Sequence, residues 1–587
     1  MWCLCLAAPA RLVAGPERSV SRSAPWGGFI MTPPAILQDY RRLGVIGRDD
    51  LAAATVLVGM AAREGSPEPD LLAWLGLCLA VRTVRDGHTC VDFDRIGDWA
   101  AGLDPATDVA LDWPLSATPW LAALQAIPAL VGQPGQRRPF ILDGHRLYLG
   151  RSLAEEEAIA SAVMQDGCRR VQILLGGPGT GKTTKVARDL VDRMAQLPAG
   201  QRPPRLALAA PTGKAASRMT DVLRARCAEA GAAPEVVAAV TAEPARTVHK
   251  LLGYNPAAKQ PFAFHAGNRL PHDLVIVDEA SMLSSSLMHH LLVALAPDAE
   301  ILLVGDPDQL ASVAAGTVLG DIAAFRAEAF ASHPLHGRIE ELTTNHRAQH
   351  APGIVALAQA IRQGDPEATI AVLESQPADV TWVEPGSSSA FNELTSTVVA
   401  HAERLCQAAA GGHPDDVLRT QAKLQVLCGH REGSFGVAGW NARIESRLGI
   451  PPAKPWYAGR PVMVTRNNRS LALFNGDVGV TVPVAGGSSR LEAVFGQPGQ
   501  TVRVPISRLE DVATVHALTI HKSQGSEYDH AVVVLPERPS RIVTRELLYT
   551  GVTRAKSRVT VVGSRAVIEA AVSRPIRRAT GLTARMS

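Results

Sequence analysis

No stretch of this sequence approaches the ~20 consecutive apolar residues that a membrane-spanning helix needs. Residues 1–30 have a short apolar start, but they lack the basic segment that precedes it in a secretory signal. We interpret them as a disordered extension or a mis-assigned start, because Met31 opens a better globular pattern. Together these absences predict a cytoplasmic protein without membrane contact.

The cysteines form no C-x-x-C pair, and no histidine stands beside them at zinc-ligand spacing. Their pattern therefore favours reduced thiols in a cytosolic protein over a disulfide framework or a zinc site. The net charge is only +3, which neither supports nor excludes nucleic-acid binding, because a local basic groove matters more than the total. The eight scattered cysteines are Cys3, Cys5, Cys78, Cys90, Cys168, Cys227, Cys406 and Cys428.

The chain has 587 residues, enough for about three or four domains, and its composition is that of a globular protein. Residues 31–150 predict a mainly helical N-terminal domain, whose clearest helix, 71–81, is apolar nearly all round and so expected to be buried. This segment carries no chemistry of its own. We interpret it as a partner-docking or structural domain.

After residue 150 short apolar runs bounded by turn residues recur, which is typical of buried parallel strands. The runs fall into two groups, so the sequence predicts two α/β sheets, in domains 151–335 and 336–587. An insert at about 220–269 interrupts the first domain. A glycine-rich, β-like insert at about 461–515 predicts a small β-barrel in the second. The runs are residues 171–175, 206–210, 274–277, 301–304, 531–535 and 559–562.

The segment GGPGTGKTT lies between an apolar strand and an expected helix, which is the context that a phosphate-binding loop requires. Its glycines let backbone N–H groups close on phosphate oxygens, Lys182 reaches the β- and γ-phosphates, and Thr183 takes a Mg²⁺ position. The loop therefore predicts a nucleoside triphosphate and Mg²⁺ as ligands. Its residues are Gly176, Gly177, Pro178, Gly179, Thr180, Gly181, Lys182, Thr183 and Thr184.

The run LVIVDEAS brings two carboxylates to the C-terminal end of an apolar strand, where ligands of open sheets bind. We predict that Asp278 holds Mg²⁺, and that Glu279 polarises the attacking water as a general base. A strand followed by an acidic helix start would look similar. Beside the phosphate loop, however, the pair indicates hydrolysis rather than phosphoryl transfer to another substrate.

Three further polar side chains complete the predicted catalytic set. Gln309, in ILLVGDPDQL, ends the next strand and is placed to contact the γ-phosphate. Arg347 and Arg554 would stabilise the charge that develops on that phosphate. Taken alone, the glutamine would be a solvated loop residue and each arginine a surface charge. If both arginines come from the second sheet, the nucleotide lies between two sheets, and hydrolysis opens and closes that cleft as in a motor.

The order of these motifs resembles superfamily 1 DNA helicases. It runs GGPGTGKTT, APTGKAA, TVHKLL, VDEAS, VGDPDQLASV, NHR, TIHKSQGSEYD and YTGVTRAK. Within that superfamily, VGDPDQLASVAAGTVLGDI and HKSQGSEYDHAVVVLP are most similar to the RecD branch, the alpha subunits of exodeoxyribonuclease V. The resemblance covers residues 149–563 strongly and the N-terminal domain more weakly. It implies two RecA-like motor domains, the second with an SH3-like barrel insert.

The resemblance implies an ATP-driven motor that tracks single-stranded DNA from 5′ to 3′. Its partners would be RecB-like and RecC-like subunits and DNA ends, in double-strand break repair by recombination. Gln524, Gly525 and Glu527 would couple the DNA contact to the nucleotide. Short hydroxyl, amide and basic groups suit a motor that contacts phosphates without reading bases. The implied DNA contacts are Thr212, Lys214, Thr247 and His249 from the first motor domain and Thr519, His521 and Ser523 from the second.

One position departs from the family pattern. Many relatives carry L-x-x-E-Q before the phosphate loop, where the glutamine bonds the adenine through one donor and one acceptor. Here LAEEE places Glu157 at that position, and an ionised glutamate can only accept. Strict ATP preference therefore does not follow from the sequence. We also find no carboxylate and lysine cluster of the kind that a nuclease centre needs, so the resemblance assigns DNA cleavage to another subunit.

Two other hypotheses remain at this point. A RecD-like helicase that acts alone would usually carry a longer N-terminal region than residues 31–149. A structural subunit that binds nucleotide and DNA without hydrolysis would have no chemical need for all of the catalytic set. A RecB-like and a RecC-like reading frame beside this gene would separate the subunit from the stand-alone enzyme.

Overall fold

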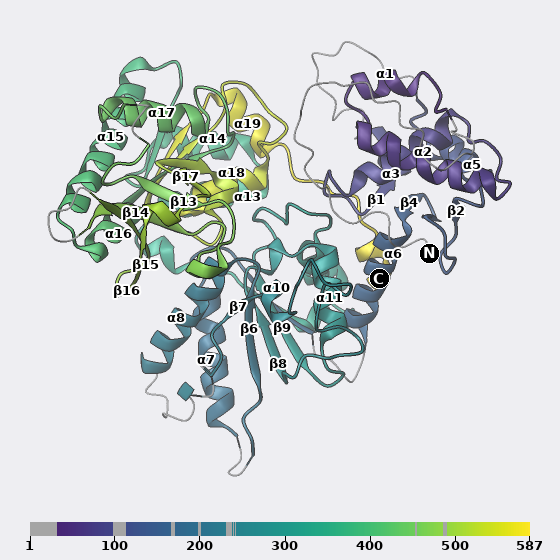
Figure 1. Ribbon diagram of the computed structural model, residues 1–587, viewed down its shortest axis with the longest axis horizontal. Helices are drawn as coiled ribbons and strands as arrows, with labels where there is room; N and C mark the ends of the chain where they lie inside the picture. Colours follow the sequence, from purple (N-terminus) through teal and green to yellow (C-terminus); the bar gives the residue numbers. More distant parts are fainter. Residues whose placement is uncertain are drawn as a thin grey trace.

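The computed structural model describes residues 32–97, 113–165, 171–197, 201–229, 237–238, 240, 242–451, 455–484 and 490–587. Our interpretation of residues 1–30 lies outside these ranges, as does part of the insert at about 220–269. Figure 1 shows an N-terminal body in purple, a blue to teal body with the first large sheet, and a green to yellow body with the second. The chain builds them in that order and then returns to the first two.

The N-terminal body is mainly helical, as predicted. Helix α3 begins where the Asp70 carboxylate accepts a hydrogen bond from the Ala73 N–H at 2.8 Å. It is buried on nearly every side because it is apolar all round, and Trp74 is fully buried. The expected helix at 71–81 is thus confirmed. The helices are α1 (Leu37–Arg42), α2 (Arg48–Arg63), α3 (Leu71–Thr83) and α5 (Ala117–Gln125). They pack with a sheet of β1 (Cys90–Asp92), β4 (Arg146–Leu149), β3 (Phe140–Asp143) and β2 (Val131–Gly132), in that spatial order.

The first large sheet is parallel throughout, in the order β10-β5-β9-β8-β6-β7. The expected strands at 171–175, 206–210, 274–277 and 301–304 are all present. The sheet extends beyond residue 335, because β10 pairs with β5. Its strands are β5 (Val171–Gly176), β6 (Leu206–Ala210), β7 (Arg246–Thr247), β8 (Leu274–Val277), β9 (Glu300–Gly305) and β10 (Ile339–Leu342). Its helices include α6 (Gly150–Met164), α7 (Lys182–Ala195), α8 (Gly213–Glu229), α10 (Val248–Leu251), α11 (Ser285–Ala294) and α12 (Val318–Ala323).

The second large sheet is also parallel, in the order β11-β20-β19-β12-β18. It contains the expected strands at 531–535 and 559–562, within β19 and β20. The strands are β11 (Val380–Val383), β12 (Leu424–Cys428), β18 (Ala517–Thr519), β19 (Tyr528–Val534) and β20 (Ala555–Val562). The helices are α13 (Pro352–Gln363), α14 (Pro366–Ser375), α15 (Ser388–Ala410), α16 (Pro414–Lys423), α17 (Val437–Arg447), α18 (Arg545–Thr553) and α19 (Arg565–Val572).

An antiparallel sheet occupies the place of the expected barrel. Its order is β16-β15-β14-β13-β17. One face packs Val480 and Val494 against α15 and α16, while Val462, Phe495 and Val504 gather in a separate apolar cluster. The strands are β13 (Pro461–Val464), β14 (Val478–Pro483), β15 (Leu491–Gln497), β16 (Gln500–Pro505) and β17 (Val512–Thr514).

The end of the chain, residues 578–587, crosses back from the second sheet to the other two bodies (Figure 1). We call this segment the C-terminal strap. Arg578 donates to the Ala314 and Gly316 carbonyls at 2.7 and 2.9 Å, and the Ala579 carbonyl accepts from the Thr89 N–H at 3.0 Å. The strap ends in α20 (Leu582–Met586), which packs on α6 with Leu582 and Met586 in the core of the first sheet.

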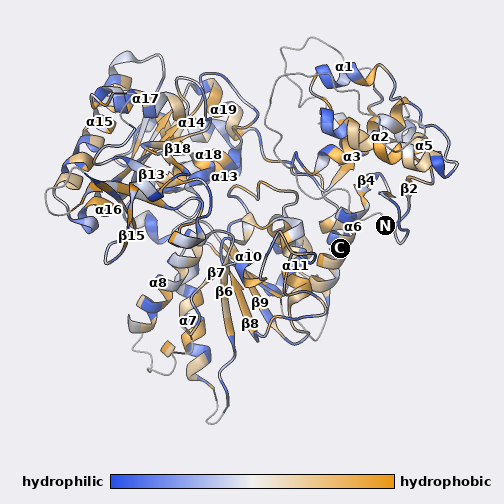
Figure 2. Ribbon diagram, in the orientation of Figure 1, coloured by the Kyte–Doolittle hydropathy of each residue, from blue (hydrophilic) through white to orange (hydrophobic). Residues whose placement is uncertain are grey.

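Apolar residues are frequent in the central strands of the sheets, where the ribbon is orange in Figure 2. Within the described ranges no helix combines the length and apolar character that crossing a bilayer requires. The cysteines that fall in these ranges are free thiols: Cys78, Cys90, Cys227, Cys406 and Cys428.

Candidate nucleotide and nucleic-acid sites

The loop between β5 and α7 has the backbone shape that phosphate binding needs. Gly179 and Gly181 have φ angles of +82° and +81°, a region that side chains beyond glycine rarely adopt. The Thr180 hydroxyl donates to the Gly177 carbonyl at 2.8 Å and closes the turn. Lys182 Nζ donates to the Gly176 and Gly177 carbonyls at 2.5 and 3.0 Å, so its ammonium group lies across the loop.

The two acidic residues follow β8 directly. One Asp278 oxygen accepts from the Glu279 N–H at 2.8 Å. Burial, followed by the neighbouring Glu279 carboxylate, raises the pKa of Asp278 to about 6. Glu279 has a φ of 53°, an uncommon value for a residue with a side chain. Such backbone strain persists where the surrounding structure enforces it, and here it turns the glutamate into the space beside the phosphate loop.

A cavity of about 760 Å³ lies between the bodies that contain the two large sheets. The first sheet supplies the phosphate loop, Asp278, Glu279 and Gln309, and Arg554 comes from the second. The structure thus brings the predicted catalytic residues to one cavity. Gly176 and Gln524 do not line it: the Gly176 carbonyl accepts from Lys182, and Gln524 contacts the first sheet elsewhere. The lining includes Gly177, Pro178, Gly179, Thr180, Gly181, Lys182, Thr183, Thr184, Arg188, Arg218, Asp278, Glu279, Gln309, Arg347, Gly525, Glu527 and Arg554.

Gln309 and Arg554 are bonded to each other across the cleft. Arg554 Nη2 donates to Gln309 Oε1 at 2.6 Å, and Gln309 Nε2 donates to an Asp306 oxygen at 3.0 Å. The same Asp306 oxygen accepts from the Tyr549 hydroxyl at 3.1 Å. Arg554 is 3% exposed and also donates to the Thr550 and Ser526 carbonyls. Its guanidinium is therefore held at one place by several acceptors.

Backbone contacts reinforce this junction. The Leu310 N–H donates to the Thr550 hydroxyl at 3.0 Å, and Gln524 Nε2 donates to the Leu310 carbonyl at 3.1 Å. Leu310 follows β9 of the first large sheet, whereas Thr550 lies in α18 and Gln524 follows β18, both of the second body. A short chain of hydrogen bonds thus links the segment after β9 to the second body.

Glu527 is bound by arginines from two other segments. Its oxygens accept from Arg347 Nη2 at 2.8 Å and from Arg218 Nη2 at 2.6 Å. Arg347 also donates to the Thr553 and Ala555 carbonyls at 3.0 and 2.9 Å. Burial alone would raise the pKa of Glu527, but Arg218, Arg347 and Arg554 together lower it to about 2. The carboxylate is ionised at neutral pH.

This ion-pair set predicts a pH-dependent contribution to stability. Because the folded pKa of Glu527 lies below its ordinary value of 4.5, the stabilisation is fully present above pH 4.5 and is lost as the pH falls toward about 2. The thermal midpoint of the wild type should exceed that of Glu527→Gln at about pH 6, and the gap should narrow by about pH 3. A gap that stays constant over this range would contradict the assignment.

The predicted DNA-contacting residues lie on two outer strands and the segments after them. Thr212 follows β6, and Thr247 ends the neighbouring strand β7, where it pairs with Ala210. Thr247 accepts from the Lys250 N–H at 3.2 Å and begins α10. His249 is exposed, and its ring lies 5.3 Å from that of Tyr254. Lys214 is half-buried in the first turn of α8.

The second group is less accessible. Thr519 ends β18, an outer strand of the second sheet. Ser523 is fully buried, and its hydroxyl donates to the Ile520 carbonyl at 2.7 Å. A direct contact between Ser523 and a DNA phosphate would therefore require this segment to move. Burial lowers the pKa of His521, so its imidazole is neutral at neutral pH.

Glu157 does not line the cavity. Its carboxylate lies 4.0 Å from Arg585 Nη1 of the C-terminal strap, and its neighbour Glu156 accepts from the Gly581 N–H of the same strap. The strap thus contacts α6 at the buried Glu156, while the neighbouring Glu157 side chain stays exposed. The assignment of Glu157 to the adenine-binding position stays a prediction.

Sequence reasoning missed Arg218, Asp306 and Tyr549. Asp306 and Tyr549 lie within motifs that we recognised, so their polar groups could have been assigned there. Arg218 follows Lys214 by four residues on α8, and that spacing places both on one face of a helix. None of the described residues forms a group of three or more His, Cys, Asp or Glu side chains suited to holding a metal ion by themselves.

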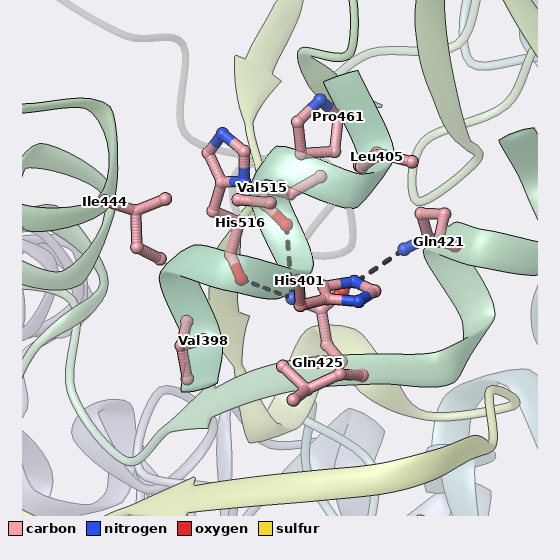
Figure 3. Close-up of a pocket in the computed structure, with 11 residues that line it drawn as sticks. Val398, His401, Leu405, Gln421, Gln425, Ile444, Pro461, Val515 and His516 are labelled. Carbon is pink, nitrogen blue, oxygen red and sulfur yellow. Dashed lines mark hydrogen bonds between the residues drawn. The ribbon is translucent and has the colours of Figure 1, made fainter. Parts of the chain in front are cut away.

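A second cavity, of about 10 Å³, lies inside the second body (Figure 3). Gln425 Nε2 donates to the Val515 and His516 carbonyls at 3.1 and 2.9 Å, and His516 Nε2 lies 2.7 Å from the Tyr457 hydroxyl. Burial lowers the pKa of His516 to about 3. This space is too small for a ligand. Its hydrogen bonds join β12 to residues 515–516, the segment that follows the last strand of the antiparallel sheet.

Comparisons with known proteins agree with this arrangement. Residues 42–148 match the family described as RecBCD enzyme subunit RecD, N-terminal domain, residues 156–315 match an AAA domain, and residues 514–562 match a UvrD-like helicase C-terminal domain. The RecBCD enzyme subunit RecD of Mycolicibacterium smegmatis is 41% identical over 91% of this chain and 97% of its own length. That of Mycobacterium tuberculosis is 39% identical over 95% and 98%.

More distant similarities were also found. The ATP-dependent RecD2 DNA helicase of Deinococcus radiodurans is 32% identical over 72% of this chain, which spans 51% of that enzyme. A crystal structure of Bacteroides Pif1 bound to ssDNA covers 69% of this chain and 91% of its own, at 16% identity and a TM-score of 0.37.

Proposed function

Because this chain belongs to the RecD family of helicase subunits, we propose that it is the ATP-driven, 5′ to 3′ DNA-translocating subunit of a RecBCD-type complex in double-strand break repair. The cavity between the two large sheets carries this proposal, since its catalytic groups come from both. The length of the relatives supports a subunit over a stand-alone helicase. The chain spans nearly all of two RecD subunits but about half of the RecD2 helicase.

We assign the bodies separate roles. Residues 31–150 dock the RecB-like or RecC-like partner, and residues 151–335 and 336–587 are the RecA-like motor domains, with β10 completing the first sheet. The antiparallel sheet β13–β17 serves as the SH3-like barrel, because it encloses the apolar cluster of Val462, Phe495 and Val504. The protein acts in the cytoplasm, where single-stranded and double-stranded DNA ends are its substrates.

The residues around the phosphate loop fit Mg²⁺ together with ATP. Mg²⁺ usually takes one or two protein ligands and completes its shell with water and phosphate oxygens. Thr183 and Asp278 would supply those ligands, and the burial that raises the pKa of Asp278 is the cost that a neighbouring cation offsets. A bound Mg²⁺ would neutralise charge on the phosphate oxygens. The loop N–H groups and Lys182 orient those oxygens.

The remaining groups carry out hydrolysis and couple it to movement. Glu279 accepts a proton from the attacking water, and Gln309 orients that water or the γ-phosphate. Arg347 and Arg554 stabilise the charge of the transition state. When the phosphate leaves, the second sheet shifts relative to the first. The hydrogen bond between Gln309 and Arg554 and those of Leu310 transmit this movement. Thr519 and His521, on the DNA side, move with the second sheet.

Hydrolysis of ATP by the full chain should be strongly stimulated by single-stranded DNA, with or without added RecB-like and RecC-like subunits. Lys182→Gln should lower the rate by about 10²- to 10³-fold, because it removes a cationic donor to the phosphates. The variant should still co-purify with the partners, because the Lys182 ammonium group donates to carbonyls of the phosphate loop inside the cavity. No hydrolysis by the wild type under any of these conditions would favour a structural subunit, and loss of co-purification would contradict the role of Lys182.

A further inference from the structure

A tight turn of the antiparallel sheet, residues 474–477, reaches the DNA-facing side of the first motor domain. We call it turn 474–477. The Asp477 carboxylate accepts from the Phe474 N–H at 2.7 Å, and the Asp477 N–H donates to the Phe474 carbonyl at 2.9 Å. Gly476 has a φ of +97°, which glycine adopts without strain. The turn is thus a compact unit that leads into β14.

The turn contacts lysines from two separate motif segments and packs beside a third. The Phe474 ring centroid lies 3.6 Å from Lys250 Nζ, in the geometry of a cation–π contact. Asn475 Oδ1 accepts from Lys522 Nζ at 3.0 Å. The Phe474 ring also packs on the start of α8, where a Cβ added at Gly213 would lie 3.3 Å from it, so the turn sits directly beside Lys214.

The charge of the Asp477 carboxylate interacts favourably with two of these lysines. Burial raises the pKa of Asp477, and the Phe474 N–H, Lys214 and Lys250 oppose that rise. Burial lowers the pKa of Lys214 to about 8, and the Asp477 charge opposes this shift. The Asp477 carboxylate is therefore within electrostatic reach of two lysines, while the Asn475 amide oxygen bonds the third. A nucleic-acid backbone would offer the same lysines phosphate oxygens.

We propose that Lys214, Lys250 and Lys522 form one phosphate-binding cluster for single-stranded DNA, and that turn 474–477 occupies this cluster in the free chain. The Asp477 carboxylate and the Asn475 amide oxygen stand in for phosphate oxygens, and the Phe474 ring stands in for a stacked base. This inference rests on the proposed DNA-translocating function, and it adds Lys250 and Lys522 to the DNA contacts. DNA must displace the turn in order to bind.

Displacement also has a route to the nucleotide cavity. The turn packs on Gly213 at the start of α8, and the same helix carries Arg218, which is paired with Glu527 inside the cavity. Removal of the turn frees the first turn of α8, so DNA binding on one side can alter the ion pair on the other. This route gives DNA stimulation of hydrolysis a physical basis.

The test is binding of a fluorescent oligothymidylate to the full chain over a series of salt concentrations. Asp477→Asn should bind the oligonucleotide roughly three- to tenfold more tightly, because turn 474–477 would occupy the lysine cluster in a smaller fraction of the chains. The amide oxygen of the new asparagine can still accept from the Phe474 N–H. Asn475→Ala, at an exposed position, should also tighten binding. Asp511→Asn is the matched control. It removes the same charge directly before β17, where Asp511 pairs with Arg466, and it should leave the affinity for the oligonucleotide unchanged.

The lysines give a second readout. Lys250→Ala and Lys522→Ala should weaken binding, and each should lower the slope of log affinity against log salt by about 1. Weaker or unchanged binding by both Asp477→Asn and Asn475→Ala would overturn the inference, as would lysine variants with the wild-type slope. A wild-type chain that binds no oligothymidylate, alone or with its partners, would instead overturn the proposed function.

Discussion

Replacing Arg554 with alanine is expected to lower the rate of DNA-stimulated ATP hydrolysis by about 10³- to 10⁵-fold, the range found when an arginine that stabilises phosphoryl transfer is removed. The guanidinium is 3% exposed, lines the cavity and donates to Gln309, Thr550 and Ser526. Its place is fixed before the reaction begins, so little reorganisation is needed as charge develops on the γ-phosphate. Single-turnover hydrolysis with saturating DNA measures this effect.

Two further variants separate chemistry from folding. Arg554→Lys keeps the charge but cannot reach all three acceptors with one planar group, so it should recover only a small part of the rate. Arg558→Ala removes an exposed arginine from β20 and should keep the wild-type rate. Arg554→Ala leaves Gln309 Oε1 without its donor, so its thermal unfolding must be compared with that of the wild type. Hydrolysis within tenfold of the wild type by a folded Arg554→Ala chain would contradict the catalytic role.

The local structure around the site followed from sequence pattern because it depends on neighbours in the chain. The run 274–277 is apolar at every position, which suits a strand buried on both faces, and it forms β8 with Asp278 and Glu279 directly after it. The shape of the phosphate loop could also be predicted from its sequence, since Gly179 and Gly181 adopt the positive φ angles that the motif requires. These features need no information about distant segments.

The pairing between segments could not be derived in this way. Arg218 and Glu527 are separated by 309 positions, and their contact depends on how the two large sheets pack. The C-terminal strap has no strong periodic pattern, yet its Arg585 lies 4.0 Å from the Glu157 carboxylate. Motif spacing located Glu157, which lies on α6, but it could not indicate this contact with the strap. Polar contacts of this kind have no local sequence signal.

Replacing Glu279 with glutamine is expected to lower hydrolysis by about 10²- to 10⁴-fold, the usual contribution of a positioned general base. Glutamine has nearly the same shape and can adopt the left-handed backbone at this position about as well, but it cannot accept the proton of the attacking water. The φ of 53° indicates that the surrounding structure holds this side chain in the cavity. Nucleotide binding should persist, because Lys182 and the loop N–H groups are unchanged.

The useful measurement is therefore a comparison of binding with turnover. Glu279→Gln should bind a fluorescent ATP analogue with near wild-type affinity while single-turnover hydrolysis falls, and Glu328→Gln, at an exposed position of the same body, should alter neither. A parallel loss of binding and hydrolysis would place Glu279 in nucleotide binding or folding rather than in proton transfer. An ATP-bound variant that no longer turns over would also hold the cleft in its closed state. In that state, the bonds from Gln309 and Leu310 to the second sheet should persist, and affinity for single-stranded DNA would report how strongly the two sites are coupled.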